Sequence, residues 1–174
     1  MSDALVGGFY VRWAAVPPEP PLTGLPLGEL RLDGKKQPFV PFTHPWGKRR
    51  ACISVEVRDG RAVSGDEEGF SAGAEQFDSD ITVGRHPRAA LGCDGEHLIA
   101  LACDGRANDE AGLTLDELAA TMVALGAREA INLDGGGSTS LVCGGRLRNH
   151  PREAHEISVP GGRAIATALV FTPR

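Results

Sequence analysis

Three pairs of short apolar runs, each joined by a glycine-containing dipeptide, constrain the fold of this chain more than any other feature. The turns and their flanking runs are Asp59-Gly60 between 51–58 and 61–63, Asp94-Gly95 between 88–93 and 97–103, and Gly144-Gly145 between 140–143 and 146–148. Such dipeptides close β-hairpins, because glycine and aspartate tolerate the left-handed torsions of a tight turn. Strands joined by tight turns pair antiparallel, so the sequence predicts a largely antiparallel or mixed β-sheet.

One amphipathic helix is expected at about 114–126. Thr114 and Glu117 have the spacing of a capping box, and Gly126 is placed to end the helix in the left-handed conformation. Apolar residues recur on one face at helical spacing: Leu115, Leu118, Ala119, Met122 and Leu125. We expect this helix to pack on the sheet without contributing to chemistry.

The strands and the helix together predict the fold class. Further strands are expected near 5–11, 29–32, 130–133 and 164–171. A sheet packed by one main helix is an α+β arrangement. The length of 174 residues suits one domain, so residues 1–174 are expected to form a single domain.

Charge and hydropathy exclude several partners. With 18 basic and 23 acidic residues and a net charge of −5, the chain lacks the basic face of a nucleic-acid-binding protein. No apolar run reaches the roughly 18 residues that cross a bilayer, so no membrane partner is expected. The N-terminus lacks the basic and apolar regions of a signal peptide, which predicts a cytoplasmic location, or secretion if an N-terminal segment is missing. The sequence leaves the oligomeric state undetermined.

The four cysteines form no metal motif. None belongs to a CxxC pair, and their spacing matches no zinc site: Cys52, Cys93, Cys103 and Cys143. Each lies in an apolar, strand-like stretch. We therefore expect reduced, buried cysteines that pack as small apolar residues.

A glycine-rich segment, Asn132-Leu133-Asp134-Gly135-Gly136-Gly137-Ser138-Thr139, joins two expected strands. Three consecutive glycines cost entropy on folding, but they expose backbone amides that can form a concave nest for an anion. Ser138 and Thr139 add hydroxyl donors, and Asp134 places a carboxylate at the rim. The alternative, a tight turn whose glycines only satisfy backbone angles, stays open on these residues alone. The segment lacks the Gly-Lys-Ser/Thr ending of a Walker A loop, and the strand expected after it argues against a dinucleotide fingerprint.

Two further segments are expected beside the same end of the sheet. Arg85-His86-Pro87-Arg88 precedes one strand of the central hairpin, and Asp104-Gly105-Arg106 follows the other. The hairpin therefore brings Arg88, Asp104 and Arg106 together. Two guanidiniums and a carboxylate suit recognition of a phosphodiester, because arginine offers fork-shaped, permanently charged donors. A structural salt bridge between Asp104 and either arginine is the alternative.

These segments, in this order, resemble the phosphodiester glycosidase family. The matching motifs are Arg85-x-Pro87-Arg88, Leu91-Gly92, Asp104-Gly105-Arg106, Gly112-Leu113-Thr114, Glu117-Leu118-Ala119, Leu125-Gly126-Ala127, Asn132–Thr139, Asn149-x-Pro151 and Arg163. The resemblance is densest over about 85–171. In the N-terminal half, Gly7-Gly8-Phe9-Tyr10 looks like a further family segment, with Val6 standing where the family's asparagine is expected.

The resemblance implies a hydrolase that cleaves the glycosidic bond of a sugar 1-phosphodiester and releases free sugar and a phosphomonoester. For that reaction, the candidate catalytic carboxylates are Asp134 and Asp104, either of which could act as base or nucleophile, and the sequence does not assign the two roles. The implied substrate-binding residues are Arg88, Arg106, Asn132, Gly135, Gly136, Gly137, Ser138, Thr139 and Asn149. The implied partner is a small molecule or glycan that carries a phosphodiester. No cofactor and no metal ligand are expected, although a divalent cation beside Asp134 stays an open alternative, since carboxylate and backbone oxygens suit a hard ion.

Two other functions remain in view. Attack at phosphorus would use a pair of metals held by histidine and aspartate, but the five histidines form no recognisable ligand pair. A non-catalytic or divergent sugar-phosphate- or carbohydrate-binding domain is the other alternative. It is motivated by Val6 and by the few residues that precede it.

Overall fold

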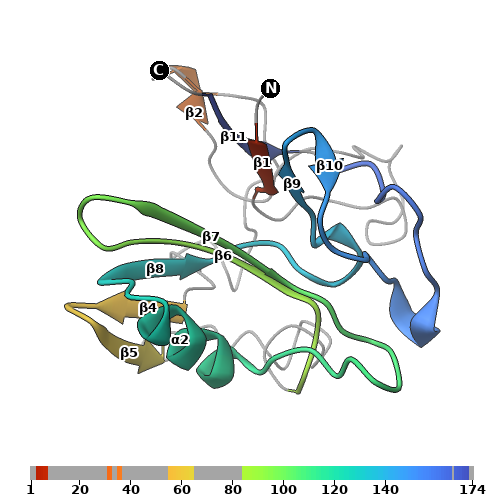
Figure 1. The fold of residues 1–174 in the computed structure, drawn as a ribbon, viewed down its shortest axis with the longest axis horizontal. Helices are drawn as coiled ribbons and strands as arrows, with labels where there is room; N and C mark the ends of the chain where they lie inside the picture. The colour runs from red at the N-terminus through yellow and green to blue at the C-terminus, as the bar shows by residue number, and fades with distance from the viewer. Residues whose placement is uncertain are drawn as a thin grey trace.

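The computed structural model of the chain describes residues 3–7, 31–32, 35–36, 55–64, 84–165 and 167–172. A five-stranded antiparallel sheet is the centre of the described fold. Its strands, in spatial order, are β5 (Arg61–Ser64), β4 (Val55–Arg58), β8 (Glu129–Asn132), β6 (Arg88–Cys93) and β7 (Leu98–Cys103). The helix α2 (Leu115–Ala124) packs on one face of this sheet (Figure 1).

A second antiparallel sheet lies on the other side of the first, away from α2 (Figure 1). Its order is β10 (Arg146–Leu147), β9 (Leu141–Cys143), β1 (Asp3–Val6) and β11 (Ala168–Phe171). Three shorter features complete the described elements: the ribbon β2 (Arg31–Leu32) with β3 (Lys35–Lys36), and the 3₁₀ turns η3 (Gly136–Ser138) and η4 (Ala154–Glu156). Antiparallel sheets with one main helix confirm the predicted α+β class.

The three predicted hairpins are confirmed as β4–β5, β6–β7 and β9–β10. The expected terminal strands are shorter where they are described: β1 begins at Asp3, and β11 begins only at Ala168. Gly161 and Gly162 both take a φ of 79° and form a turn, and residues 163–165 after it belong to no strand. Residues 8–11, 29–30 and 51–54 of the predicted strands lie outside the described residues.

The helix α2 begins and ends as its sequence predicts. Thr114 accepts a hydrogen bond from the Glu117 amide, and the Glu117 side chain accepts one from the Thr114 amide, which completes the capping box. Gly126 follows with a φ of 93°. The helix buries Leu118, Ala119 and Met122 against Val57 and Ala90 of the sheet.

A second apolar cluster fills the space between the two sheets. Leu5, Val6 and Ala89 are its buried members, and Leu91, Leu133, Leu141, Ile165 and Phe171 pack against them. Alternate residues of β6 therefore face opposite cores, Ala90 toward α2 and Ala89 toward the second sheet. Burial on both faces fixes the middle strands, so the segments that leave their ends have fixed starting points.

The expected burial of the cysteines is wrong for Cys143. The three described cysteines are free thiols, with Cys93 and Cys103 half-buried and Cys143 exposed. Cys143 stands at the end of β9, beside the exposed Gly144-Gly145 turn, where none of the described elements covers it. Cys52 lies outside the described residues. No helix in the described ranges combines the length and the hydropathy needed to cross a membrane.

Candidate active site

Three chain segments leave the central sheet together at one end. Arg88, the first residue of β6, pairs with Cys103, the last residue of β7. Two residues along β6, Ala90 pairs with Asn132, the last residue of β8. Asp104 and the glycine-rich turn therefore flank the start of β6, which confirms the predicted placement of these segments at one sheet end.

The glycine turn is held by its own hydrogen bonds and by the segment before β6. The Gly136 amide donates to the Pro87 carbonyl at 2.9 Å, and the Gly135 amide donates to Oδ1 of Asp134 at 2.8 Å. The Asp134 amide in turn donates to the Gly7 carbonyl at 3.0 Å. Two of the three glycine amides expected to form an open nest thus already have acceptors within the chain.

Each glycine of the turn has its own physical reason. Gly136 has a φ of 60°, which favours glycine. A methyl group on Gly135 would lie 2.7 Å from the Pro87 carbonyl oxygen, so that position needs glycine for close packing. Gly137 lies inside η3 without a positive φ, and a methyl group there would meet the Glu153 carboxylate. The proposal that the glycines only satisfy backbone angles thus fits Gly136 alone.

Of the two predicted arginines, Arg106 contacts this turn, whereas the Arg88 side chain binds the carbonyls of Leu113 and Gly84. A methyl group on Gly136 would lie 3.1 Å from Nη1 and 3.3 Å from Nη2 of Arg106, so the guanidinium rests against the bare backbone. Arg88 is only 4% exposed, and its Nε donates to the Leu113 carbonyl at 3.1 Å. Burial, and then repulsion from Arg106, lower the pKa of Arg88 to about 10. Arg88 is therefore charged at neutral pH and is repelled by the Arg106 guanidinium.

The two predicted acids have different surroundings. Asp134 is buried at the start of the glycine turn, with 6% of its surface exposed. Asp104 points to another segment: Oδ1 accepts from the His150 amide at 2.8 Å, and Oδ2 lies 3.2 Å from Nδ1 of His150. The Oδ2 atom of Asp104 thus contacts a histidine side chain, where the sequence suggested a salt bridge to an arginine as the alternative.

Asn149 braces the exit of the turn. Its Oδ1 accepts from the Leu141 amide at 2.9 Å, and its Nδ2 donates to the Thr139 carbonyl at 2.9 Å and to Oδ1 of Asp104 at 3.1 Å. The side chain is 8% exposed. These contacts link the turn to Asp104, while contact of Asn149 with a substrate stays a prediction.

Three more predicted substrate-binding residues have buried side chains: Asn132 at the end of β8, and Ser138 and Thr139 in the turn itself. Asn132 is 4% exposed, and Ser138 and Thr139 are fully buried. Oδ1 of Asn132 and Oγ1 of Thr139 have no hydrogen-bond partner among the described residues. Their positions support the turn from inside, and their contact with a substrate also stays a prediction.

A second charged pair at the turn was missed by the sequence reasoning. Arg163 donates from Nε to Oγ of Ser138 at 3.1 Å, also contacts that oxygen through Nη2, and donates from Nη1 to Oε1 of Glu153 at 2.6 Å. Arg163 had fitted the family pattern without being chosen as a site residue. Glu153 carries no local signal, since it lies in an irregular segment 16 residues beyond Gly137 (153 − 137).

Asp104 also belongs to a potential metal-ligand group. One ligand atom each from Asp104, Glu110 and His150 lies within 4.8 Å of the others. Arg152 pairs with Glu110 through Nη1, so a positive charge already balances this cluster. No local signal in the sequence marks this group of one histidine and two carboxylates, because the three residues come from separate segments.

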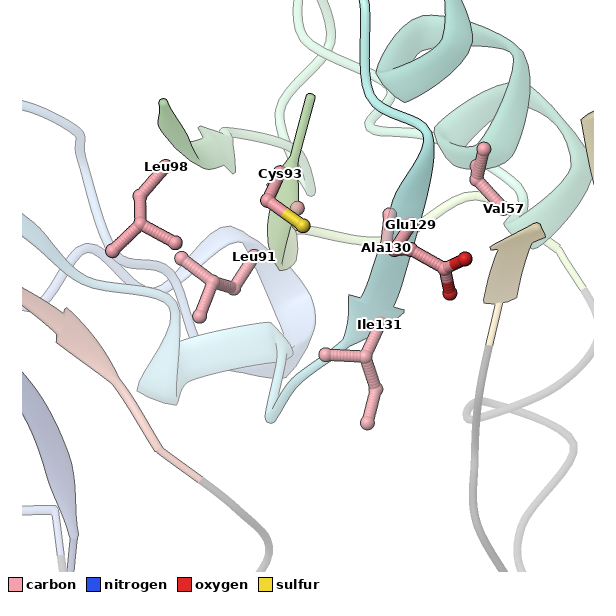
Figure 2. A pocket seen from close by; sticks show the side chains of 8 residues that line it. Val57, Leu91, Cys93, Leu98, Glu129, Ala130 and Ile131 are labelled. Atoms are coloured by element: carbon pink, nitrogen blue, oxygen red, sulfur yellow. The ribbon is translucent and has the colours of Figure 1, made fainter. Parts of the chain in front are cut away.

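Described residues line cavities both far from the glycine turn and near it. One of about 350 Å³ is lined by Leu91, Cys93, Leu98, Glu129 and Ile131, among others, at the far end of β6 and β8 from the glycine turn. Figure 2 shows its largely apolar side chains gathered on the sheet. The other, of about 290 Å³, is lined by residues 147–151 and 158–161 and so adjoins Asn149. This second cavity borders the cluster of Asp104, Glu110 and His150, because His150 is part of its lining.

Known proteins match this chain in sequence. A family model described as phosphodiester glycosidase matches residues 31–172. The N-acetylglucosamine-1-phosphodiester alpha-N-acetylglucosaminidases of Homo sapiens and Bos taurus are each 30% identical to it over 130 residues, which is 73% of this chain. The match covers 24% of the human enzyme and 23% of the bovine one, so the chain spans about a quarter of the length of these curated relatives.

A solved structure shares the fold. It is the catalytic domain of the zebrafish N-acetylglucosamine-1-phosphodiester alpha-N-acetylglucosaminidase, auto-inhibited by its pro-peptide. The TM-score is 0.66 at 23% sequence identity, and the match covers 99% of this chain and 63% of that one. The arrangement of sheets and helix described above is thus that of a known catalytic domain.

Proposed function

The chain belongs to the phosphodiester glycosidase family, and on that premise we propose that it hydrolyses the glycosidic bond of a sugar 1-phosphodiester. The products would be a free sugar and a phosphomonoester. The substrate would be a small molecule or a glycan that carries the diester. The chain spans about a quarter of the length of its curated relatives. We therefore base the proposed activity on the site residues of this chain and not on the whole of those enzymes.

One observation carries the proposal: Arg106 rests against the glycine turn that begins with Asp134, and its charge repels that of Arg88 at the start of the neighbouring strand β6. Two guanidiniums that repel each other gain from an anion bound near them, because the anion offsets that repulsion. Arg106 rests against Gly136. The carbonyl of Pro87, the residue before β6, accepts a hydrogen bond from the Gly136 amide. A phosphodiester supplies the anion, and it would lie beside a carboxylate.

The chemistry of the leaving group fits such a site. A phosphomonoester is a weak base, so it leaves the anomeric carbon with little help from a general acid. The main tasks are to hold the diester and to direct water or a nucleophile to the sugar carbon. Preorganised guanidinium donors suit the first task, because they need no reorganisation as charge moves onto the phosphate. This division of labour requires no cofactor.

Of the two predicted carboxylates, Asp134 is the better candidate for the second task. Asp104 accepts hydrogen bonds from the His150 amide and from Asn149, which hold it toward the segment after β10. Asp134 lies on the turn that Arg106 contacts. We therefore assign Asp134 to attack on the sugar carbon, as base or nucleophile, and Asp104 to support of the turn.

A panel of glycosyl phosphodiesters tests the proposal, with free reducing sugar followed in the presence and absence of a chelator. We expect sugar release that survives the chelator; loss of release with chelator would instead indicate a divalent cation beside Asp134. Hydrolysis in oxygen-18 water should label the sugar, whereas label on phosphate would indicate attack at phosphorus.

The variant Asp134→Asn tests the assigned role. It should abolish turnover while the circular dichroism spectrum stays unchanged. Asp109→Asn, which neutralises an exposed carboxylate, is the matched control and should remain active. Near-normal turnover by Asp134→Asn would contradict the assignment.

A second candidate function is sugar-phosphate binding without catalysis. Val6, at the position where the family pattern has asparagine, is buried in the core between the two sheets. It therefore offers no polar group to a substrate. Saturable binding of a sugar phosphate, with no product after long incubation, would support this second function.

A further inference from the structure

The Glu153 carboxylate lies directly on the backbone of the glycine turn. A methyl group on Gly137 would stand 2.6 Å from Cδ of Glu153 and 2.8 Å from each of its two oxygens. The whole carboxylate thus occupies the space that a side chain at position 137 would fill. It comes from the segment before η4, far along the chain from the turn.

Glycine at position 137 is explained by this contact and by nothing in its torsion angles. Gly137 lies within η3, and its φ is outside the left-handed region that favours glycine. Gly136, the neighbouring residue, does have a positive φ. The absence of a side chain at Gly137 therefore leaves space for an oxyanion group, which the Glu153 carboxylate fills. We call this space against Gly137 the seat.

Arg163 supplies the charge of this seat. Its Nε and Nη2 reach Oγ of the fully buried Ser138, which fixes the plane of the guanidinium, and its Nη1 donates to the carboxylate. The fork of an arginine accepts a carboxylate or a phosphate with similar geometry. The carboxylate oxygens of Glu153 and the oxygens of a phosphate are therefore interchangeable ligands for the Arg163 guanidinium.

The seat is reachable and lies next to the site already described. Gly137 and Ser138 are buried beneath this pair, whereas the side chains of Glu153 and Arg163 are 25% and 17% exposed, so an anion reaches the seat when the carboxylate leaves it. Arg106 rests on Gly136, one residue away, and adjacent Cα atoms are about 3.8 Å apart. An anion on Gly137 would thus lie beside Arg163, one residue along the turn from the glycine that Arg106 contacts.

We propose that Arg163, Ser138 and the open face of Gly137 form an oxyanion subsite that Glu153 occupies in the free protein and that the phosphate group of the substrate takes over on binding. The Glu153 carboxylate is then an internal competitor for the subsite. The part about the substrate rests on the proposed function, whereas the anion exchange itself does not. The ligand class is a phosphate ester or phosphate ion.

Calorimetric titration with inorganic phosphate tests the exchange. Glu153→Gln keeps the size of the side chain and removes its charge, so it should bind phosphate more tightly than the natural protein. If the carboxylate fills the seat about nine-tenths of the time, the gain is about tenfold, because apparent affinity scales with the fraction of vacant sites. Glu110→Gln is the matched control: Glu110 also pairs with an arginine, Arg152, but does not cover a glycine of the turn.

Two outcomes would overturn the proposal. One is an affinity of Glu153→Gln equal to or below that of the natural protein. The other is an equal gain in Glu110→Gln, which would reduce the effect to net charge. The predicted result is a gain confined to Glu153→Gln.

Gly137→Ala gives an independent test that does not require the Glu153 variant to fold. The helical torsions of η3 accept alanine, and its methyl group would displace the carboxylate and fill the seat. Phosphate binding should fall at least tenfold, and binding as in the natural protein would contradict the subsite. Arg163→Lys should also weaken binding, because lysine lacks the fork that holds Ser138 and an anion together.

The outcomes separate this inference from the proposed function. A natural protein that releases no sugar from any diester, but whose Glu153→Gln variant binds phosphate more tightly, would keep the subsite and reject the hydrolase. An active enzyme in which neither Glu153→Gln nor Gly137→Ala changes phosphate affinity would do the reverse.

Discussion

Asn149 donates a 3.1 Å hydrogen bond to the Asp104 carboxylate from the same nitrogen that holds the Thr139 carbonyl at 2.9 Å. The other end of its side chain accepts from the Leu141 amide. One buried amide group thus joins the end of the glycine turn, the start of β9 and the segment after β7. This connection explains how three distant parts of the chain keep a common geometry around the turn.

Asn149→Ala should therefore destabilise the protein by about 1–3 kcal/mol, the usual cost of leaving buried polar groups unpaired. The Thr139 carbonyl and the Leu141 amide would both lose a partner. Urea unfolding measures the change. Asn108→Ala removes an exposed asparagine and should shift the free energy of unfolding by less than about 0.5 kcal/mol. Equal stability of the two variants would contradict the bracing role.

Gly136→Ala should cost stability for two separable reasons. Alanine at a φ of 60° costs about 1–2 kcal/mol, and its methyl group would also press on the Arg106 guanidinium. Gly60→Ala is the matched control, because Gly60 has a φ of 72° and nothing within 4 Å of an added methyl group. Both variants should unfold at lower urea concentration, but only Gly136→Ala should also weaken phosphate binding. Unchanged phosphate affinity in Gly136→Ala would argue against Arg106 as an anion contact.

Much of the fold could be predicted because its signals are local. The dipeptides Asp59-Gly60, Asp94-Gly95 and Gly144-Gly145 each specify a turn by their own torsions, and Thr114 with Glu117 specifies the start of α2. The placement of Arg88 opposite Cys103, the residue before Asp104, also followed from local information, since a hairpin brings its two ends together.

The finer structure of the site could not be predicted, because it depends on contacts across the sequence. The same three-glycine run contains one residue chosen for torsion, one for a neighbouring carbonyl and one for a carboxylate. Only the segment before η4 determines that Glu153 reaches Gly137, and only the segment after β10 determines that Asp104 turns to His150. No periodicity or spacing in the chain encodes either approach.

The turn of the β6–β7 hairpin should make stability depend on pH. Hydrogen bonds from the His97 and Glu96 amides lower the pKa of Asp94 to about 2, from an ordinary value of 3.8. Because the folded-state pKa is the lower one, the stabilisation is present above about pH 4 and is lost as the pH falls through about 2. Asp94→Asn should remove this component. Its urea midpoint should lie below that of the natural protein at pH 5 and approach it by pH 2, whereas a constant difference would contradict the linkage.

The repulsion between Arg88 and Arg106 should be visible in how anion affinity changes with pH. Burial and the Arg106 charge lower the pKa of Arg88 to about 10, so Arg88 loses its charge in an accessible range. Sulfate keeps its charge across this range and is therefore a suitable probe. Its affinity should be level from pH 7 to 9 and fall as the pH rises through about 10, because the site then loses one of its cations.

Arg106→Gln tests whether the two guanidiniums are coupled. Removing the Arg106 charge removes one cause that lowers the pKa of Arg88, so the fall in sulfate affinity should move to higher pH, even though overall affinity is weaker. Arg128→Gln changes the net charge equally at an exposed position, and it should leave the pH of the fall where it is. If both variants gave the same pH profile, the repulsion between Arg88 and Arg106 would not be the cause. A shift found only in Arg106→Gln would tie the pH dependence to the pair that carries the proposed phosphodiester site.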